Sequence, residues 1–105
     1  MDKYKVVISQ RAFTSVFECV SFVKRLSTES SEKLYLEIMS SINSLSTFPD
    51  RNPEIKDLTI RQTPIRRMII CEGRYAIIYK ISNNNEVFVY DVLDNRKDNK
   101  LLNII

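Results

Sequence analysis

The stretch RRMIICEGRYAIIYKISNNNEVFVYDVL, residues 66–93, decides the fold because it predicts three strands joined by two tight turns. The runs RRMIIC, RYAIIYKI and EVFVYDVL are rich in the β-branched and aromatic residues that strands favour. Gly73, the only glycine in the chain, lies between the first two runs and can supply the positive φ of a tight turn. Residues 82–85, SNNN, form the second turn because Asn tolerates left-handed backbone. We therefore expect a three-strand antiparallel meander.

A strand and two helices are expected before this meander. Residues 3–9, KYKVVIS, have strand composition, and Ser9 can cap the helix that follows. A first apolar stripe at helical spacing consists of Phe13, Val16, Phe17, Val20, Val23 and Leu26. A second stripe consists of Leu34, Ile38, Ile42 and Leu45. Two such helices joined by a short polar turn predict an antiparallel helical hairpin.

Polar and proline-containing segments mark the ends of the two helices. STESSE, residues 27–32, ends the first helix and offers capping hydroxyls, with Glu32 expected near the positive end of the second helix. FPDRNP, residues 48–53, ends the second helix because its two prolines cannot continue one. Residues 54–64 show no clear period.

The resulting fold class is α+β. An N-terminal strand, an antiparallel helical hairpin and a three-strand antiparallel meander form one sheet packed against the helices. A length of 105 residues suits a single domain spanning 1–105.

The formal charge of +3 is unevenly distributed. Residues 1–50 carry six basic and six acidic side chains, whereas residues 51–105 carry ten basic and seven acidic ones. A clustered basic surface would attract phosphate or an acidic partner. The alternative is that a charge of this size serves only solubility.

Several classes of site and location are disfavoured by composition. The chain has no His, and Cys19 and Cys71 are isolated, so we expect no metal, no cofactor and no Cys–His catalysis. Both cysteines are interpreted as structural. MDKYKVVISQ does not resemble a signal peptide, and no apolar run has the length of a membrane span, so we expect a cytoplasmic protein without membrane contact.

The order of these elements resembles the RelE/ParE superfamily of type II toxin–antitoxin toxins. The resemblance rests on KYKVVIS, on INSLSTFP at the end of the second helix, and on GRYAIIYKI followed by VFVYDVLDNRKD, and it spans essentially the whole chain. It implies a four-stranded antiparallel sheet and a toxin neutralised by a cognate antitoxin whose flexible segment wraps it. The toxin would be a monomer or dimer within that complex.

Two activities occur in the superfamily: ribosome-dependent mRNA cleavage in RelE-like members and DNA gyrase inhibition in ParE-like members. RNA cleavage needs an acid, a base and cations for the charged transition state. This chain lacks His, and its last residues, LLNII, offer no late Tyr, Lys or Arg. The position after Tyr75, commonly Arg in the superfamily, is Ala76, for which Arg74 could partly substitute.

The candidate site residues are therefore mostly cations of the second half. Target or phosphate binding is assigned to Arg66, Arg67, Arg74, Arg96 and Lys97, and any catalysis to Arg67, Arg74, Tyr90 and Arg96. Antitoxin binding is assigned to the apolar residues Leu101, Leu102, Ile104 and Ile105.

Each assignment has a structural alternative. Arg66 and Arg67 could mark a solvated strand edge, and Arg96 could pair with Asp94 or Asp98. Tyr75 and Tyr79 fit a core role better than proton transfer, and the apolar tail could simply pack onto the domain.

The interpretation that follows is a growth-inhibitory toxin, leaning to ParE-like gyrase inhibition rather than enzyme activity. An mRNA endonuclease is the alternative, and a non-toxic interaction module on the same fold is a third.

Overall fold

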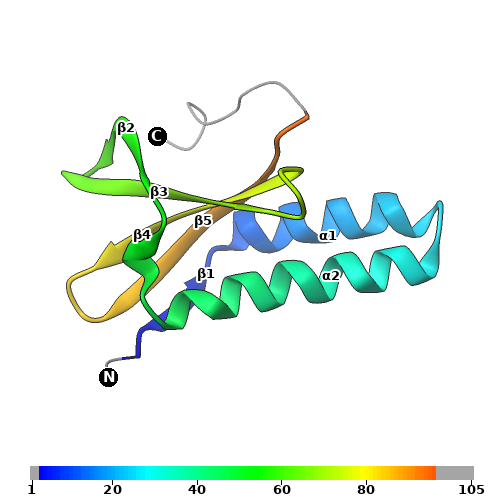
Figure 1. Ribbon diagram of the computed structural model, residues 1–105, viewed down its shortest axis with the longest axis horizontal. Helices are drawn as coiled ribbons and strands as arrows, with labels where there is room; N and C mark the ends of the chain where they lie inside the picture. The colour runs from blue at the N-terminus through cyan, green and yellow to red at the C-terminus, as the bar shows by residue number, and fades with distance from the viewer. Residues whose placement is uncertain (1–2, 97–105) are drawn as a thin grey trace.

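The computed structural model describes residues 3–96 and contains a five-stranded sheet with two helices on one face (Figure 1). The helical elements are α1 (Gln10–Lys24), α2 (Thr28–Asn43) and two 3₁₀ turns, η1 (Ser44–Ser46) and η2 (Pro49–Arg51). The strands are β1 (Lys5–Ile8), β2 (Glu54–Ile60), β3 (Thr63–Ile70), β4 (Tyr75–Ser82) and β5 (Glu86–Asp94). The α+β class is confirmed.

The predicted meander is confirmed as β3–β4–β5, with both turns where they were expected. Gly73 has a φ of 89°, and its two predecessors, Cys71 and Glu72, also have left-handed backbone. Asn85 has a φ of 53° in the second turn. The capping role of Ser9 is confirmed too, because its side chain accepts a hydrogen bond from the Ala12 N–H.

The expectation of an entirely antiparallel, four-stranded sheet is wrong on two points. The strand order is β1-β5-β4-β3-β2, and β1 pairs with β5 in parallel. The helical hairpin returns the chain past the start of β1, where the Tyr4 N–H donates to the Ser46 carbonyl at 2.8 Å. From there β2 runs opposite to β1, and three further reversals leave β5 parallel to it.

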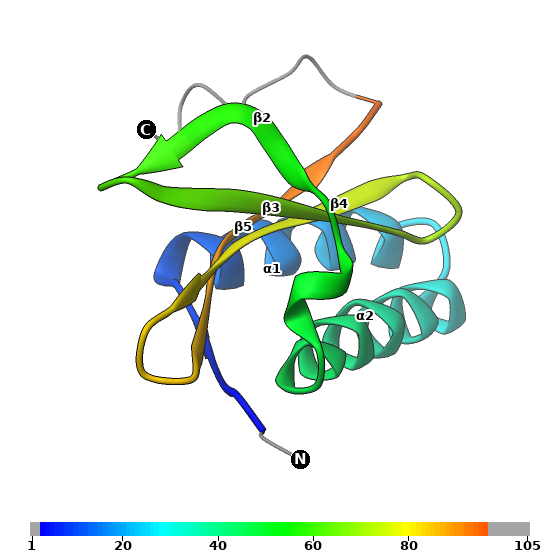
Figure 2. The same ribbon diagram turned by 60° about the vertical axis from the view of Figure 1, so that its left-hand side comes forward.

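The additional strand is β2, from the segment without a clear period. Its register against β3 shifts between Glu54 and Thr59, and Asp57 adopts a φ of 61°. Such a bulge interrupts the two-residue alternation that marks a strand in sequence. Figure 2 shows β2 arching over the side of the sheet away from the helices.

The helix boundaries also differ from expectation. The connection between the helices is short, since Ser27 caps α2 and Glu29, rather than Glu32, lies in its first turn.

In the first apolar stripe Val16 and Val23 are buried, whereas Phe13, Phe17 and Leu26 are exposed. The outer half of that stripe is therefore surface.

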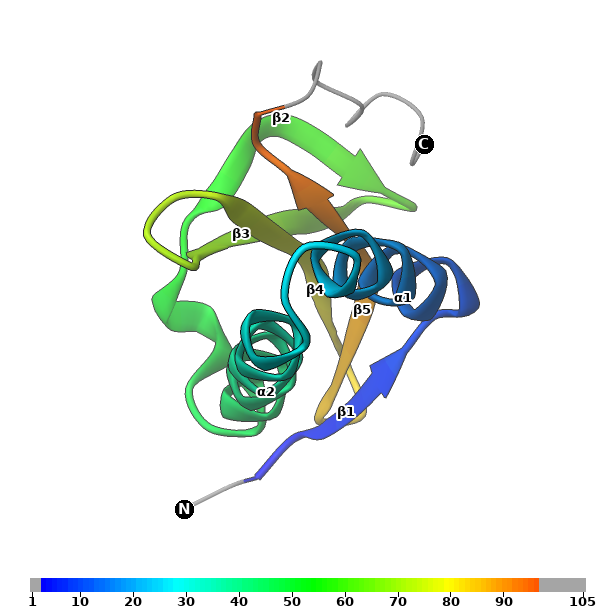
Figure 3. The same cartoon turned by 90° about the vertical axis from the view of Figure 1, so that its right-hand side faces the viewer.

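Two apolar cores hold the layers together. The main core lies between the helices and the sheet and includes Val16, Ile38, Ile42, Ile77 and Val89 (Figure 3). A smaller core, Leu58, Ile65, Ala76 and Ile78, lies under β2 on the opposite face. Strand alternation explains this division because successive residues of β4 point to opposite faces.

Within residues 3–96, neither helix is long and apolar enough to cross a membrane.

Candidate functional site

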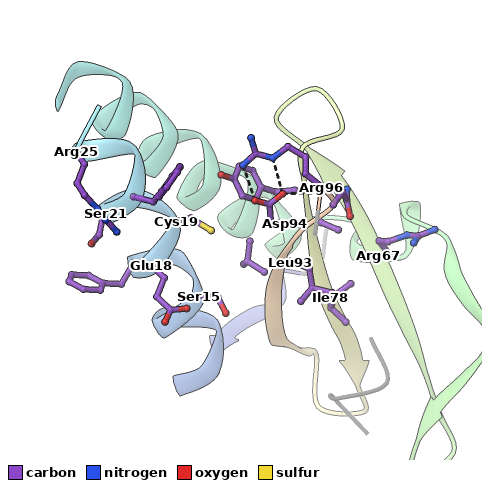
Figure 4. A pocket seen from close by; sticks show the side chains of 16 residues that line it. Ser15, Glu18, Cys19, Ser21, Arg25, Arg67, Ile78, Leu93, Asp94 and Arg96 are labelled. Carbon is purple, nitrogen blue, oxygen red and sulfur yellow. Dashed lines mark hydrogen bonds and ion pairs between the residues drawn. The ribbon is translucent and has the colours of Figure 1, made fainter. Parts of the chain in front are cut away.

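A groove of about 910 Å³ lies between α1 and the second half of β5 (Figure 4). It exists because β1 pairs only with Glu86–Val89, so among residues 3–96 no strand lies beside β5 beyond Val89 on that side. We call it the β5 groove. Its lining includes Glu18 from α1 and Arg25 directly after it, Arg67 from β3, Asp94 at the end of β5, and Arg96 two residues beyond that strand.

A buried carboxylate fixes α1 against β5 beside this groove. Asp91 is 3% exposed and accepts hydrogen bonds from the Arg11 Nε at 3.1 Å, the Ser15 hydroxyl and the Val92 N–H. The β4–β5 register shifts at this point, which makes room for an extra residue in β5. A buried carboxylate is tolerated only when it is paired in this way.

The cations of the groove differ in how available they are. Arg96 donates from Nε to Asp94 Oδ1 at 3.1 Å and from Nη2 to Oδ2 at 2.8 Å, and these bonds raise its pKa. Arg25 lies over the Phe22 ring at 5.6 Å. Arg67 is exposed, and its side chain has no hydrogen bond or ion pair with any residue in 3–96. Arg67 is thus the cation most available to a ligand.

Two of the other arginines assigned from sequence lie elsewhere. The Arg66 side chain is 19% exposed and donates to the carbonyls of Asp50 and Asn52 and to Glu54. Arg74 lies over the Tyr75 ring at 5.4 Å, before β4 begins, and does not line the groove. The structure therefore brings Arg67 and Arg96 to one groove, and Arg66 and Arg74 to other positions.

The remaining sequence assignments fall beyond the described range. Lys97 and the apolar residues Leu101, Leu102, Ile104 and Ile105 lie outside residues 3–96.

On the face of the sheet opposite the helices, Tyr90 belongs to a small aromatic cluster. Its ring meets Phe88 edge-on at 4.8 Å, and the Lys80 Nζ lies 6.0 Å from its centre. The sequence interpretation missed Lys80. Strand alternation from Ala76 and Ile78 would have placed it on this face, so a signal was present.

The titratable groups near the sheet are poorly suited to proton transfer at neutral pH. Burial raises the pKa of both Tyr75 and Tyr79. Burial, together with Glu37, raises the pKa of Cys71 to about 12, so its thiol is not a nucleophile at neutral pH. Within residues 3–96, no three His, Cys, Asp or Glu side chains lie close enough together to hold a metal ion. The chemistry this arrangement supports best is recognition of carboxylate or phosphate by arginine.

Comparison with solved structures identifies the fold. A chain of the RelBE2 toxin–antitoxin complex from Mycobacterium tuberculosis is similar over 92% of this chain and 97% of its own, with a TM-score of 0.60 and 17% identity. A free mutant of the E. coli toxin RelE is similar over 88% of this chain and 83% of its own, with a TM-score of 0.51 and 16% identity. The chain thus has a RelE/ParE-like toxin fold, as its sequence predicts. No protein-family model and no curated protein sequence matches it.

Proposed function

We propose that this chain is the toxin of a bacterial type II toxin–antitoxin system, which slows growth until a cognate antitoxin neutralises it. The observation that carries the proposal is the similarity in fold, over about nine-tenths of the chain, to RelE and to a chain of the RelBE2 complex. The β5 groove supports it because it combines an available arginine with an accessible apolar lining.

The proposed mode of action is ParE-like binding to a protein target, namely DNA gyrase. RNA cleavage needs a proton acceptor and a proton donor beside the cations. The chain has no His, and the tyrosines Tyr75 and Tyr79 are buried with raised pKa values. Arg67, by contrast, can bind a carboxylate of a partner without any proton transfer.

A second candidate is a RelE-like, ribosome-dependent mRNA endonuclease. The specific observation in its favour is the cluster of Lys80, Phe88 and Tyr90 on the face opposite the helices. Aromatic rings beside a cation are a common platform for single-stranded RNA, because bases stack on the rings while the cation meets the phosphates.

The proposed antitoxin surface within residues 3–96 is the outer side of the helical hairpin. A groove of about 490 Å³ between α1 and α2 is lined by apolar side chains that include Phe17, Val20, Tyr35 and Leu36. Phe17 is 72% exposed and Leu36 65% exposed. Such a surface suits the apolar face of an amphipathic helix from the antitoxin.

The test of this proposal is expression in bacteria, alone and together with the reading frame beside the gene. Growth should slow without the antitoxin and recover with it, and the two proteins should copurify as a tight complex. A chain that leaves growth unchanged would favour the non-toxic interaction module.

Two further measurements on the toxic chain distinguish gyrase inhibition from mRNA cleavage. The gyrase proposal predicts loss of supercoiling activity in a purified gyrase assay and intact translated messages by primer extension. Cleavage within translated codons would replace it with the endonuclease, and Lys80→Ala and Tyr90→Phe should then lower cleavage.

Variants of the groove complete the test. Arg67→Ala should reduce toxicity while shifting stability by no more than about 0.5 kcal/mol, because the side chain is exposed. Arg96→Ala should have a smaller effect on toxicity, since Asp94 already neutralises it. As a packing control, Ile77→Ala removes a fully buried side chain and should cost about 2–5 kcal/mol. Full toxicity of Arg67→Ala at unchanged stability would remove the β5 groove from the proposal.

A further inference from the structure

Phe48 combines two unfavourable features at the connection between α2 and β2. Its backbone is left-handed, with φ 49° and ψ 55°, which is costly for a bulky side chain. The residue is 60% exposed, so burial offsets little of that cost. An outlier of this kind is a reason to look for function, because strained residues persist only where the surroundings hold them.

Arg51 holds the Phe48 backbone from one side. Its Nη1 donates to the carbonyls of Thr47 at 2.7 Å, Phe48 at 3.0 Å and Ser44 at 3.3 Å, and its Nη2 donates to the Ser44 hydroxyl at 2.8 Å. The Arg51 N–H also donates to the Phe48 carbonyl. One side chain therefore ties the end of α2 to the left-handed residue.

Two further side chains hold the rest of the loop of residues 47–52 from the sheet. The buried Tyr79 hydroxyl donates to the Pro49 carbonyl and accepts from the Asn52 amide at 3.1 Å. Arg66 donates to the carbonyls of Asp50 at 3.1 Å and Asn52 at 2.6 Å. Every carbonyl of this loop except that of Arg51 thus accepts a hydrogen bond from a side chain. The loop is a rigid support for an exposed phenyl ring.

We propose that Phe48 is the anchor by which this protein binds a folded partner protein, through an apolar pocket with a carboxylate at its rim. Aromatic anchors seated in partner pockets dominate many protein interfaces, and a rigid anchor loses little entropy on binding. We infer the carboxylate from Arg51. Its Nε has no hydrogen bond to any residue in 3–96, so Nε and Nη2 together can donate to the two oxygens of a partner's carboxylate. This inference rests on the proposed function, in which the partner is the target protein.

The rigidity of the loop favours the target over the antitoxin as the partner. A flexible antitoxin segment adapts to the surface it covers and needs no preformed anchor. A preformed pocket on a folded protein is matched best by a ring held in advance.

Three variants at position 48 distinguish the effect of the left-handed backbone on stability from the effect of the ring on binding. Phe48→Gly and Phe48→Ala both remove the ring, but only Gly relieves the left-handed backbone, so Phe48→Gly should melt at the higher temperature. Phe48→Tyr keeps an aromatic ring. In growth assays Phe48→Gly and Phe48→Ala should lose toxicity at least tenfold, measured as the inducer concentration needed to halve the growth rate, while Phe48→Tyr should retain it.

A control variant, Phe13→Ala, removes another exposed phenylalanine, one on α1, and should remain toxic. Full toxicity of Phe48→Gly, with the wild-type chain toxic, would overturn the anchor and leave the proposed function intact. A wild-type chain that does not slow growth would instead overturn the proposed function.

Photo-crosslinking decides the anchor independently of toxicity. The full chain carrying p-benzoylphenylalanine at position 48 should form one discrete protein adduct in cells, absent when the label is at position 13. The adduct protein, once purified, should bind the wild-type chain and Phe48→Tyr equally, and Phe48→Gly at least tenfold more weakly. Absence of an adduct specific to position 48, or equal binding of Phe48→Gly, would overturn the inference.

Discussion

The contact between α1 and β5 should depend on the buried carboxylate of Asp91. Asp91→Ala leaves the Ser15 hydroxyl, the Arg11 Nε and the buried Val92 N–H without their acceptor. An unpaired buried N–H costs about 1–3 kcal/mol, and hydrogen bonds to a charged group contribute about 1.5–3 kcal/mol. The Arg11 side chain is 49% exposed and regains water, which reduces its share. We expect a total loss of about 2–4 kcal/mol.

The assay is urea unfolding of the full chain, followed by circular dichroism, together with thermal melts. For a domain of this size, a loss of about 2 kcal/mol lowers the melting temperature by at least roughly 8 °C. Arg11→Ala and Ser15→Ala are the matched controls. Each removes one hydrogen bond to the charged carboxylate while the Val92 N–H stays paired, so each should cost about 1.5–3 kcal/mol, with Arg11→Ala in the lower part of that range because the Arg11 side chain is half exposed. Asp91→Ala within about 0.5 kcal/mol of wild type would refute the reasoning, because that is the range of an unremarkable surface change.

Two more predictions concern groups under the sheet. Tyr79→Phe leaves the Pro49 carbonyl without its buried donor and should lower the free energy of unfolding by about 1–3 kcal/mol. Urea unfolding measures this loss, and circular dichroism should show the strands intact. An unchanged urea midpoint would contradict a stabilising hydrogen bond between Tyr79 and Pro49. Because burial raises the pKa of Cys71 from 9.0 to about 12, only the unfolded chain loses this proton between those values. The free energy of unfolding should therefore fall as pH rises from 9 towards 12, and less so in Cys71→Ala; identical pH profiles of the two proteins would refute the shift.

Local signals in the chain were sufficient for most of the elements. The alternation in residues 66–93, Gly73 in the first turn and the Asn run in the second predicted β3, β4 and β5, because strand and turn preferences act between near neighbours. The apolar stripes predicted both helices for the same reason. The superfamily resemblance, which rests on the order of these elements, was confirmed as a fold.

Long-range pairing decided what local patterns could not. The parallel pairing of β1 with β5 depends on where the helical hairpin returns the chain, and β2 was hidden by the bulge near Asp57. The same holds for the arginines. Arg66 and Arg67 are neighbours in sequence with the same chemistry. Arg66 nevertheless donates hydrogen bonds to carbonyls of the 47–52 loop, whereas Arg67 lines the β5 groove. Adjacent residues of a strand point to opposite faces, so the sequence alone determined that Arg66 and Arg67 lie on different faces of the sheet. Only the tertiary structure decided which of the two arginines remains free to bind, because the groups packed on each face come from distant parts of the chain.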